Sequence, residues 1–565
     1  MVIRTDPATG VLKATLAVVW RQLPVPTSAT KANTLPLRTW QVLEANGVSY
    51  ADADVVGFPG PTFRVRQGDS VEITLINQLT APPVGTDTAC MQYPAAYTTD
   101  RMQDCFHGAN WTNIHYHGMH VTPRSNGDDV LLEIAPGETY RYNFRIPANQ
   151  SPGTHWYHPH KHGSVALQVL NGMSGAFIVE GGGLDSLAAA HNMLERLIAL
   201  QQIDTQPNII RDFAAAPEPT TLVNGAFAPV ILMAPGEVQR WRIVNENITK
   251  STNFQLFFPD TTGVEPTMYD VARDGVQYAP ANYSTPGQGP RADTSLIMAP
   301  GNRLDVFVQA PRNGGVFPVS ASLLSHADTA DRTRKEDLDP GPGVQRPVGF
   351  QNRAAEDRQG QGRNQGRGQG RARVGAAVAA AAPVPLFYVK VDPTLSPRNS
   401  SLPASLPQLP GFLGNLTGEV SPDSIPIIVF ADSGFGRQTP TVPTRFFLGD
   451  SASPYRKFNV DSVYVPLTAQ SVPMPMVLAD TQTWKVENQS AAANHPFHIH
   501  INPFQVMDVV YGSGDPMAPL YAQLESAAAG GNPIWLDVLP LPKPFKDASG
   551  TTVPGYAIIR QAYEP

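Results

Sequence analysis

Closely spaced histidine pairs are the residues of this sequence best suited to chemistry. The chain has 13 histidines in 565 residues, a frequency at which chance gives roughly 0.3 pairs two positions apart. The four observed pairs are His115/His117, His158/His160, His160/His162 and His498/His500. In a β-strand, residues i and i+2 lie on one face roughly 6.6 Å apart, so each pair presents two imidazoles side by side. The pairs therefore predict a metal site built on strands.

The ligand type narrows the choice of metal. Imidazole suits zinc, copper, iron and nickel, and a site of six or more histidines without a matching carboxylate or thiolate set favours copper over magnesium, calcium or iron–sulfur chemistry. A buried, hydrogen-bonded core residue is a sufficient explanation for any single histidine. It does not explain three pairs in the strings N-I-H-Y-H-G-M-H, W-Y-H-P-H-K-H-G and H-P-F-H-I-H.

Strand patterns near these pairs indicate the elements that position them. Phe63 and Val65 alternate with arginines, and Val71, Ile73 and Leu75 alternate with polar residues. This period of two predicts two half-buried strands on either side of a Gly-Asp turn.

The same construction recurs along the chain. The triplet A-P-G precedes an alternating strand at residues 135–137, 234–236 and 299–301. Strands that end in an asparagine cluster recur as I-T-L-I-N-Q, W-R-I-V-N-E and W-K-V-E-N-Q. A chain of 565 residues is also too long for one hydrophobic core. The repeats predict three related β-domains.

Composition breaks give the boundaries of these domains. We expect domains at residues 1–183, 184–326 and 386–565. Residues 327–385, rich in Gly, Arg, Gln and Ala, cannot bury enough apolar surface to offset their ordering entropy and are interpreted as a linker. An RNA-binding tail has a similar composition, but here no aromatic residue is interleaved with the arginines. Residues 185–200 show a helical pattern typical of a connector.

Three histidine motifs resemble those of a known family. H-Y-H-G at 115–118, W-Y-H-P-H at 156–160 and H-P-F-H-I-H at 495–500 are similar to the first three of four copper motifs in multicopper oxidases. This resemblance implies an all-β fold of three consecutive cupredoxin-like Greek-key β-sandwiches. It also implies a laccase-like activity that oxidises phenolic or similar small reductants and reduces O₂ to water.

The resemblance assigns metal ligands to residues of this chain. It implies His115 and His498 for a type 2 copper, His117 and His158 for one type 3 copper, His160 and His500 for the other, and His495 for a type 1 copper. Asp128 or Asp129 matches the family's acidic residue near the type 2 copper, which helps to deliver protons. Solvated loop carboxylates explain both residues equally well. His120, His155 and His162 are close enough in sequence to orient ligands.

The sequence departs from the family pattern at its fourth motif. An H-C-H string is expected after G-Y-A-I-I-R-Q-A-Y-E-P, and a type 1 copper needs its cysteine thiolate. Three explanations stay open: a truncated sequence, which we favour, a strand supplied by another chain, or a non-blue pseudo-oxidase. The last of these gives the alternative function, a non-catalytic copper-binding protein that uses the six remaining trinuclear-type histidines.

Two other function classes fit less well. A zinc hydrolase of the H-x-H-x-D-H type needs an aspartate where Met119 stands, and the strand–helix alternation of barrel amidohydrolases is missing. A purely structural sandwich leaves the histidine pairs unexplained.

Composition bounds the partners and the compartment. A net charge of −7 argues against a nucleic-acid-binding surface over the whole molecule. No apolar run approaches the roughly 18 residues that a membrane span needs, and we expect any export signal to be absent or removed. The only cysteines, Cys90 and Cys105, predict a disulfide, which favours an extracellular or periplasmic location. Oligomeric state and the identity of the reductant stay open.

Overall fold

The computed structural model describes most of the chain, and the described residues belong to one compact unit. They are residues 1–51, 56–80, 108–204, 221–248, 253–259, 264–283, 296–324, 384–396, 398–416, 427–431, 445–449, 458–460, 463–465, 481–489 and 494–562. Cys90 and Cys105, and with them the predicted disulfide, lie outside these residues, as does the predicted linker up to residue 383.

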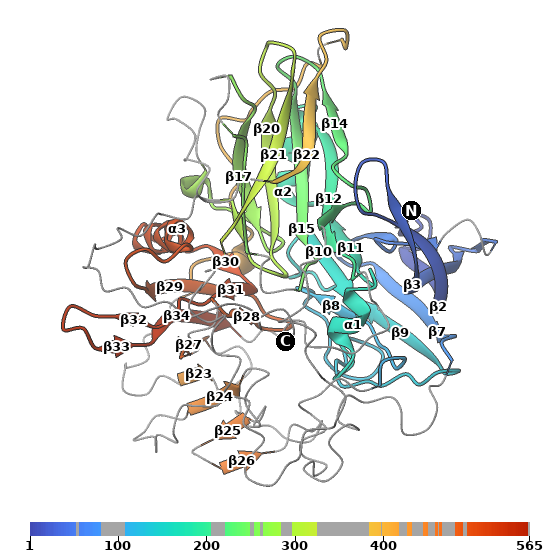
Figure 1. The fold of residues 1–565 in the computed structure, drawn as a ribbon, viewed down its shortest axis with the longest axis horizontal. Helices are drawn as coiled ribbons and strands as arrows, with labels where there is room; N and C mark the ends of the chain where they lie inside the picture. The colour runs from blue at the N-terminus through green and yellow to red at the C-terminus, as the bar shows by residue number, and fades with distance from the viewer. Residues whose placement is uncertain are drawn as a thin grey trace, which may run out of the picture. The chain divides into compact units, whose positions relative to one another are not determined.

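The N-terminal strands form two sheets, coloured blue to cyan in Figure 1. One has the order β1-β6-β11-β10-β8, with bounds Val2–Arg4, Thr62–Arg66, Gly175–Glu180, Gly153–His158 and His115–His117. The other has the order β4-β3-β2-β7-β9, with β5 beside β3, and bounds Val48–Ser49, Ala32–Ala45, Val11–Pro26, Ser70–Asn77, Thr139–Arg145 and Val56–Gly57. Their inner faces share one core, which contains Phe63, Val65, Val71, Ile73 and Leu75 as the alternation predicts. We call this pair the N-terminal sandwich.

A second pair of sheets forms the middle sandwich. One has the order β13-β12-β15-β20-β17-β18, with bounds Thr221–Val223, Leu194–Gln202, Val238–Asn245, Arg303–Gln309, Thr267–Arg273 and Val276–Gln277. The other has the order β14-β22-β21-β16-β19, with bounds Val230–Met233, Val384–Val391, Gly315–Leu323, Phe254–Phe257 and Ile297–Met298. β22 pairs with β14 and β21, so residues 384–391, which span the end of the predicted linker and the start of the predicted third domain, belong to the middle sandwich.

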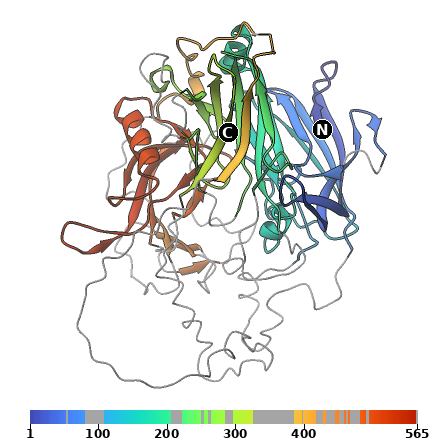
Figure 2. The same ribbon diagram turned by 45° about the horizontal axis from the view of Figure 1, so that its top comes forward.

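The C-terminal strands form one larger sheet and three short pairs. The sheet has the order β24-β23-β27-β34-β29-β30, with bounds Arg445–Gly449, Ile427–Ala431, Thr481–Asn488, Gly555–Ala562, Phe504–Val510 and Trp535–Leu536. The pairs are β25–β26, β28–β31 and β32–β33, with bounds Phe458–Val460, Val463–Val465, Pro496–His498, Val538–Pro540, Phe545–Lys546 and Thr552–Val553. Helix α3 (Ala518–Ala529) packs on β29. In both views the middle strands lie toward the top, with this sheet on the left and the N-terminal strands on the right (Figure 1 and Figure 2).

The recurring A-P-G and asparagine motifs have a common structural role. Asn77, Asn245 and Asn488 are each the last residue of a strand, and all three are fully buried. At two of the three triplets the A-P-G glycine donates its N–H to an asparagine carbonyl, over 2.7 Å from Gly137 to Asn77 and 2.9 Å from Gly301 to Asn245, whereas Gly236 donates to the Pro311 carbonyl at 3.1 Å. The repeats therefore mark equivalent turns in the N-terminal and middle sandwiches.

The helix predicted over residues 185–200 is correct only in its first half. Helix α2 covers Gly182–Ala190, and residues from Leu194 form strand β12. Asn192 has φ +52°, a left-handed conformation that ends the helix. The run from 194 pairs with β15, so tertiary pairing overrides a local pattern that suits either structure. The other helix on the N-terminal side is α1, Val165–Val169.

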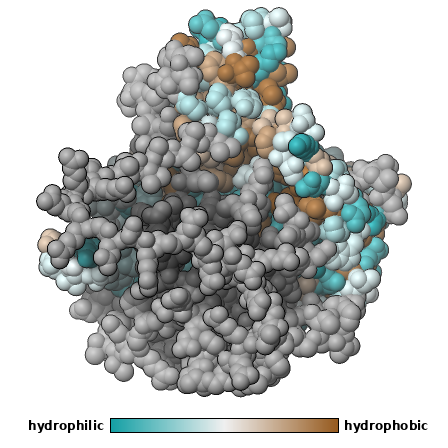
Figure 3. Space-filling view, in the orientation of Figure 1, coloured by the Kyte–Doolittle hydropathy of each residue, from teal (hydrophilic) through white to brown (hydrophobic). Residues whose placement is uncertain are grey.

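Exposed apolar side chains gather on the middle sandwich. In Figure 3 hydrophobic residues, coloured brown, are visible on the surface in the region where Figure 1 draws β14, β21 and β22. Val230 and Leu232 of the edge strand β14 and Val316 of β21 are exposed. Among the described residues, the helices are too short or too polar to cross a membrane.

A buried carboxyl group lies where the N-terminal and middle sandwiches meet. Glu246, which follows β15, accepts a hydrogen bond of 2.6 Å from the Ser174 hydroxyl. Gln201 of β12 donates to the same hydroxyl at 2.7 Å. Among the described residues, Oε1 of Glu246 and Oε1 of Gln201 have no donor. Burial, opposed by these hydrogen bonds, raises the pKa of Glu246 to about 7.

Glu246→Gln is expected to stabilise the fold at alkaline pH. The folded pKa of about 7 exceeds the ordinary value of 4.5, so the stability that the proton contributes is lost as pH rises through 7. A glutamine carries no charge there and can donate to Gln201. We expect the variant to be more stable by on the order of 2 kcal/mol at pH 8, with a gap that shrinks at pH 5. Urea unfolding at both pH values measures this, and an equal gap at both contradicts it.

Candidate metal centre

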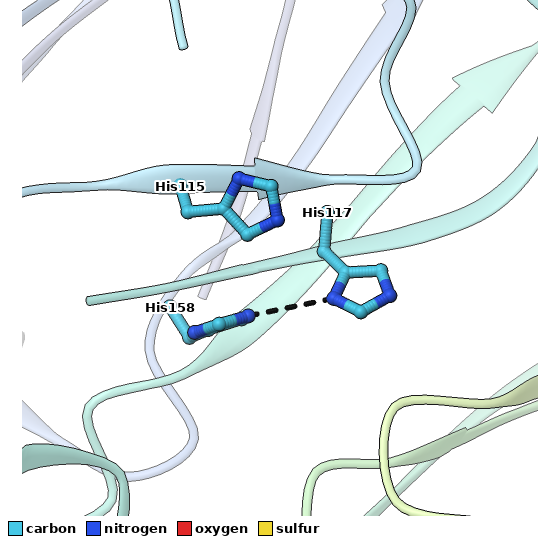
Figure 4. A group of neighbouring side chains, drawn as sticks. All are labelled: His115, His117 and His158. Carbon is cyan, nitrogen blue, oxygen red and sulfur yellow. Dashed lines mark hydrogen bonds between the residues drawn. The ribbon is translucent and has the colours of Figure 1, made fainter. Parts of the chain in front are cut away.

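Two neighbouring strands carry the first two histidine motifs. β8 pairs antiparallel with β10, with His115 opposite His158 and His117 opposite Trp156. The ring centroids of His115 and His158 are 5.1 Å apart, and those of His115 and His117 are 5.5 Å apart. In Figure 4 the three rings project from these strands toward one another.

The third motif joins the same cluster from almost 400 residues away. β28 ends at His498 and is held by pairing with β31. The His498 ring stacks on His117 with centroids 3.8 Å apart, and the His500 ring lies 4.1 Å from that of His115. His160, which follows β10, lies 4.8 Å from His500. All six histidines that the sequence assigns to the trinuclear centre therefore lie together.

Burial keeps these imidazoles neutral. It is the largest cause of a lowered pKa in each of the six, and the nearby histidines lower most of them further. The pKa of His158 falls to about 3 and that of His160 to about 4. Neutral imidazole is the form that binds metals, so the cluster is ready to bind at neutral pH without losing protons.

Hydrogen bonds at Nδ1 leave Nε2 available on three of these rings. Nδ1 of His115 lies 2.8 Å from the Asp128 carboxylate, and Nδ1 of His498 lies 2.7 Å from the carbonyl of Asp537. Nδ1 of His158 similarly faces the Pro159 carbonyl at 2.9 Å. A proton on each Nδ1 leaves a lone pair on each Nε2. Among the described residues, the buried Nε2 atoms of His115 and His498 have no partner.

His117 is oriented in the opposite sense. Its Nδ1 faces Nε2 of His158 at 3.4 Å, drawn as the dashed line in Figure 4, and its Nε2 lies 3.3 Å from Asp537 Oδ1. With the His117 proton assigned to Nε2, toward Asp537, and the His158 proton to Nδ1, toward Pro159, the two facing nitrogens are both acceptors, and one metal ion can accept both lone pairs. The pair therefore points to a metal between His117 and His158.

The donor atoms are spaced for metal binding. Three groups of possible ligand atoms each lie within 4.8 Å of one another, and they are His115/His117/His158, His115/His498/His500 and His117/His498/Asp537. The donors are almost all imidazole nitrogens, a set that suits copper or zinc. Unpartnered, buried ring nitrogens cost free energy in the absence of a ligand, so the residues present fit a copper centre.

The structure shows which of the two candidate aspartates lies at the histidine cluster, a choice that the sequence left open. The Asp128 carboxylate is buried, contacts His115 and accepts the N–H of Tyr116 at 2.8 Å. Burial raises its pKa to about 8, although the Tyr116 N–H opposes this. Asp129 is half-buried and instead caps the backbone N–H of Leu131 at 3.1 Å. Of these two aspartates, only Asp128 contacts a histidine of the cluster.

Four further histidines near the motifs in sequence do not join the cluster in the described part of the chain. His495, the expected type 1 ligand, faces its neighbouring carbonyl at Pro496. His155 is buried against the Ser151 carbonyl at 3.1 Å, and His162 is exposed. His120 lies near Asn149 at 3.5 Å.

Sequence reasoning missed Asp537. This residue contacts His117 and His498 with different atoms, yet it lies in an apolar string, I-W-L-D-V-L, without another carboxylate or histidine. In the sequence, a lone aspartate beside apolar residues is only a weak sign of a functional site. Its role becomes visible only once its partners, which are distant in sequence, are placed beside it.

Comparisons with known proteins agree with this site. Two sequence-family models, both described as multicopper oxidase, match residues 107–183 and 437–547. These segments contain all seven predicted ligand histidines.

Curated relatives of this chain are also multicopper oxidases by name. The chain is 27% identical to a multicopper oxidase of Staphylococcus haemolyticus over 202 residues, which is 35% of this chain and 38% of that protein. It is 24% identical to an iron transport multicopper oxidase of Saccharomyces cerevisiae over 315 residues, 52% of this chain and 42% of that protein. The chain thus spans about two fifths of the length of these relatives.

The fold agrees with the sequence likeness. The crystal structure of a laccase from Pediococcus acidilactici matches with a TM-score of 0.56 at 16% identity, covering 100% of this chain and 87% of that one. This confirms the predicted all-β, cupredoxin-like fold. With the matched motifs placed in one histidine cluster, the two family models and the curated relatives support the multicopper oxidase family for this chain.

Proposed function

We propose that this protein is a laccase-like oxidoreductase that takes electrons from phenolic or similar small reductants and reduces O₂ to water by four electrons. The observation that carries the proposal is the meeting of six neutral histidines from three motifs in one cluster. Bound copper supplies one-electron redox chemistry at such a site. A family that binds copper, and relatives named as multicopper oxidases, support this assignment.

We assign the ligands as the motifs imply. His115 and His498 hold the type 2 copper, and their unpartnered Nε2 atoms support this pairing. His117 and His158 hold one type 3 copper, and His160 and His500 hold the other, supported by the ring distances within the cluster. His495 serves a type 1 copper only where the family's fourth motif, which the sequence does not contain, is supplied. The chain is proposed to comprise three cupredoxin domains.

Reduction of O₂ to water consumes protons as well as electrons. Asp128 is suited to hold and release one, because its buried carboxylate contacts His115 and has a pKa of about 8. Asp129 is not assigned this role, since its carboxylate serves a backbone N–H.

The candidate activities differ in the natural reductant, which is either a phenol-type molecule or ferrous iron. The relatives include proteins named for iron transport as well as proteins named laccase, so ferrous iron is the second candidate. We favour a phenol-type reductant and an extracellular or periplasmic location. Oxygen uptake with a phenol or with ferrous ion as the only electron donor tests the choice directly. Copper bound without oxygen uptake from either donor would support a non-catalytic role.

His117→Ala is expected to remove about one copper from the protein. The substitution deletes the ring whose Nδ1 faces His158, so that metal position keeps one described imidazole. His191→Ala is the matched control, because His191 hydrogen-bonds Ser401 at 2.9 Å and takes no part in the cluster. Copper per chain, measured by atomic absorption after dialysis, should fall only in His117→Ala. Equal copper in both variants would contradict the site.

A further inference from the structure

A buried arginine of the middle sandwich lies beside the histidine cluster and contacts three parts of the chain. Arg303 is fully buried; its Nε donates to the Thr154 carbonyl of β10 at 3.0 Å and its Nη1 to the Gly301 carbonyl at 3.1 Å. Nη1 and Nη2 each donate to one carboxylate oxygen of Asp537 at 2.6 Å. A two-pronged pair of this kind fixes orientation as well as adding energy. The Asp537 carboxylate therefore cannot rotate without breaking two charged hydrogen bonds.

A second residue of the middle sandwich holds the backbone of the same segment. Asp274, also buried, accepts the N–H groups of Asp537 and Val538, each at 3.1 Å. It also accepts the N–H of Arg303 at 2.9 Å, and Asn302 donates to the Val538 carbonyl at 2.9 Å. Both the side chain and the main chain of Asp537 are thus held from the middle sandwich.

Asp537 passes this constraint to two metal-site histidines. Its Oδ1 lies 3.3 Å from Nε2 of His117, and its carbonyl accepts from Nδ1 of His498 at 2.7 Å. A fixed carboxylate keeps the His117 proton on Nε2 and leaves the lone pair on Nδ1, the atom that faces His158. The fixed carbonyl likewise keeps the His498 proton on Nδ1 and leaves Nε2 free.

We propose that Arg303 and Asp274 are positioning residues of the metal centre, which act through Asp537 to set the ring orientation and the tautomer of His117 and His498. This inference rests on the proposed copper centre. It makes the middle sandwich, which contributes no predicted ligand, a determinant of how tightly the other two parts bind metal.

If Arg303 only stabilised the fold, replacing another buried arginine of the middle sandwich would have the same effect on copper binding. Arg242 is also fully buried in the middle sandwich and also contacts Thr154, through its hydroxyl at 3.1 Å. Its other partners include Glu195 at 2.6 Å and Asp305 at 3.1 Å, and it makes no recorded contact with a cluster histidine or with Asp537. Arg242→Lys therefore controls for the loss of a buried ion-pair network.

The test is a copper titration of the metal-free full chain against a chelator of known affinity. A lysine at position 303 cannot make the two-pronged pair and the Nε hydrogen bond together. We expect Arg303→Lys to weaken copper binding by about 10- to 100-fold and to alter the hyperfine pattern of the bound Cu²⁺ in its electron paramagnetic resonance spectrum. Arg242→Lys should keep the wild-type affinity and spectrum, even where its melting temperature falls.

Two further variants keep the inference testable if Arg303→Lys does not fold. Asp537→Asn and Asp274→Asn preserve side-chain size but replace an accepting oxygen by an amide, and both should weaken copper binding in the same direction. Wild-type affinity and spectrum in the variants that fold would overturn the positioning role, as would an equal loss in Arg242→Lys. A wild-type chain that binds no copper tightly would instead overturn the proposed function, and this inference with it.

Discussion

Gly118→Ala is expected to destabilise the folded chain by about 2 to 5 kcal/mol, as the sum of a backbone cost and a steric one. Gly118 has φ +80°, a conformation that alanine adopts only at a cost. A Cβ there would lie 2.4 Å from Arg303 Nη2 and 2.6 Å from Asp537 Oδ2. Both atoms belong to the buried ion pair, so neither can move aside without breaking it.

Gly137→Ala separates the two costs. Gly137 has a similar φ of +88°, but a Cβ there would meet no atom within 4 Å. We expect this control to cost only the backbone part, about 1 to 2 kcal/mol. Urea unfolding followed by tryptophan fluorescence compares the variants at 25 °C. If both lose the same stability, the close approach of Arg303 and Asp537 to Gly118 has no energetic importance.

Gly118 also shows how far the sequence could be interpreted. The glycine stands in the H-Y-H-G string, and the pair spacing within that string was enough to predict two imidazoles on one strand face. Local patterns succeed in this way because a strand's period of two depends only on neighbouring residues. The buried faces of β6 and β7, and the Gly-Asp turn between them, were predictable for the same reason.

The need for a glycine at this position was not predictable from the sequence. The side chains that would clash with a Cβ there belong to residues far along the chain, at separations of 185 and 419 positions. Arg303 and Asp537 meet at Gly118 only after three sets of sheets assemble. The tautomers of the cluster histidines depend on carbonyls and carboxylates in the same way. The helix predicted from Leu194 onward was wrong for a related reason. Pairing with β15, a strand distant in sequence, decides that this segment is a strand.

Asp128 was predictable only as one of two candidates, since the sequence places both aspartates at a similar distance from His115. The structure decides between them by burial and contact: Asp128 lies against His115 Nδ1, while Asp129 turns to a backbone N–H. This difference gives a matched pair of variants for the proposed proton transfer.

Asp128→Asn is expected to lower the rate of oxygen consumption by about 10²- to 10⁴-fold relative to the unmodified chain, the usual contribution of a placed acid or base. The asparagine oxygen can still accept from His115 Nδ1, so the ring keeps its orientation and the protein keeps its copper. What it cannot do is take up and release a proton, as a carboxyl group with a pKa of about 8 can near neutral pH.

Asp129→Asn should leave both copper content and oxygen consumption unchanged, because its carboxylate contacts a backbone N–H outside the cluster. An oxygen electrode with a phenolic reductant, together with copper per chain, measures both quantities for the two variants. Loss of copper from Asp128→Asn would mean that the carboxylate charge is needed to hold His115 as a ligand. Full turnover with full copper would place proton delivery elsewhere, since Asp128 is the carboxylate that the structure sets against His115.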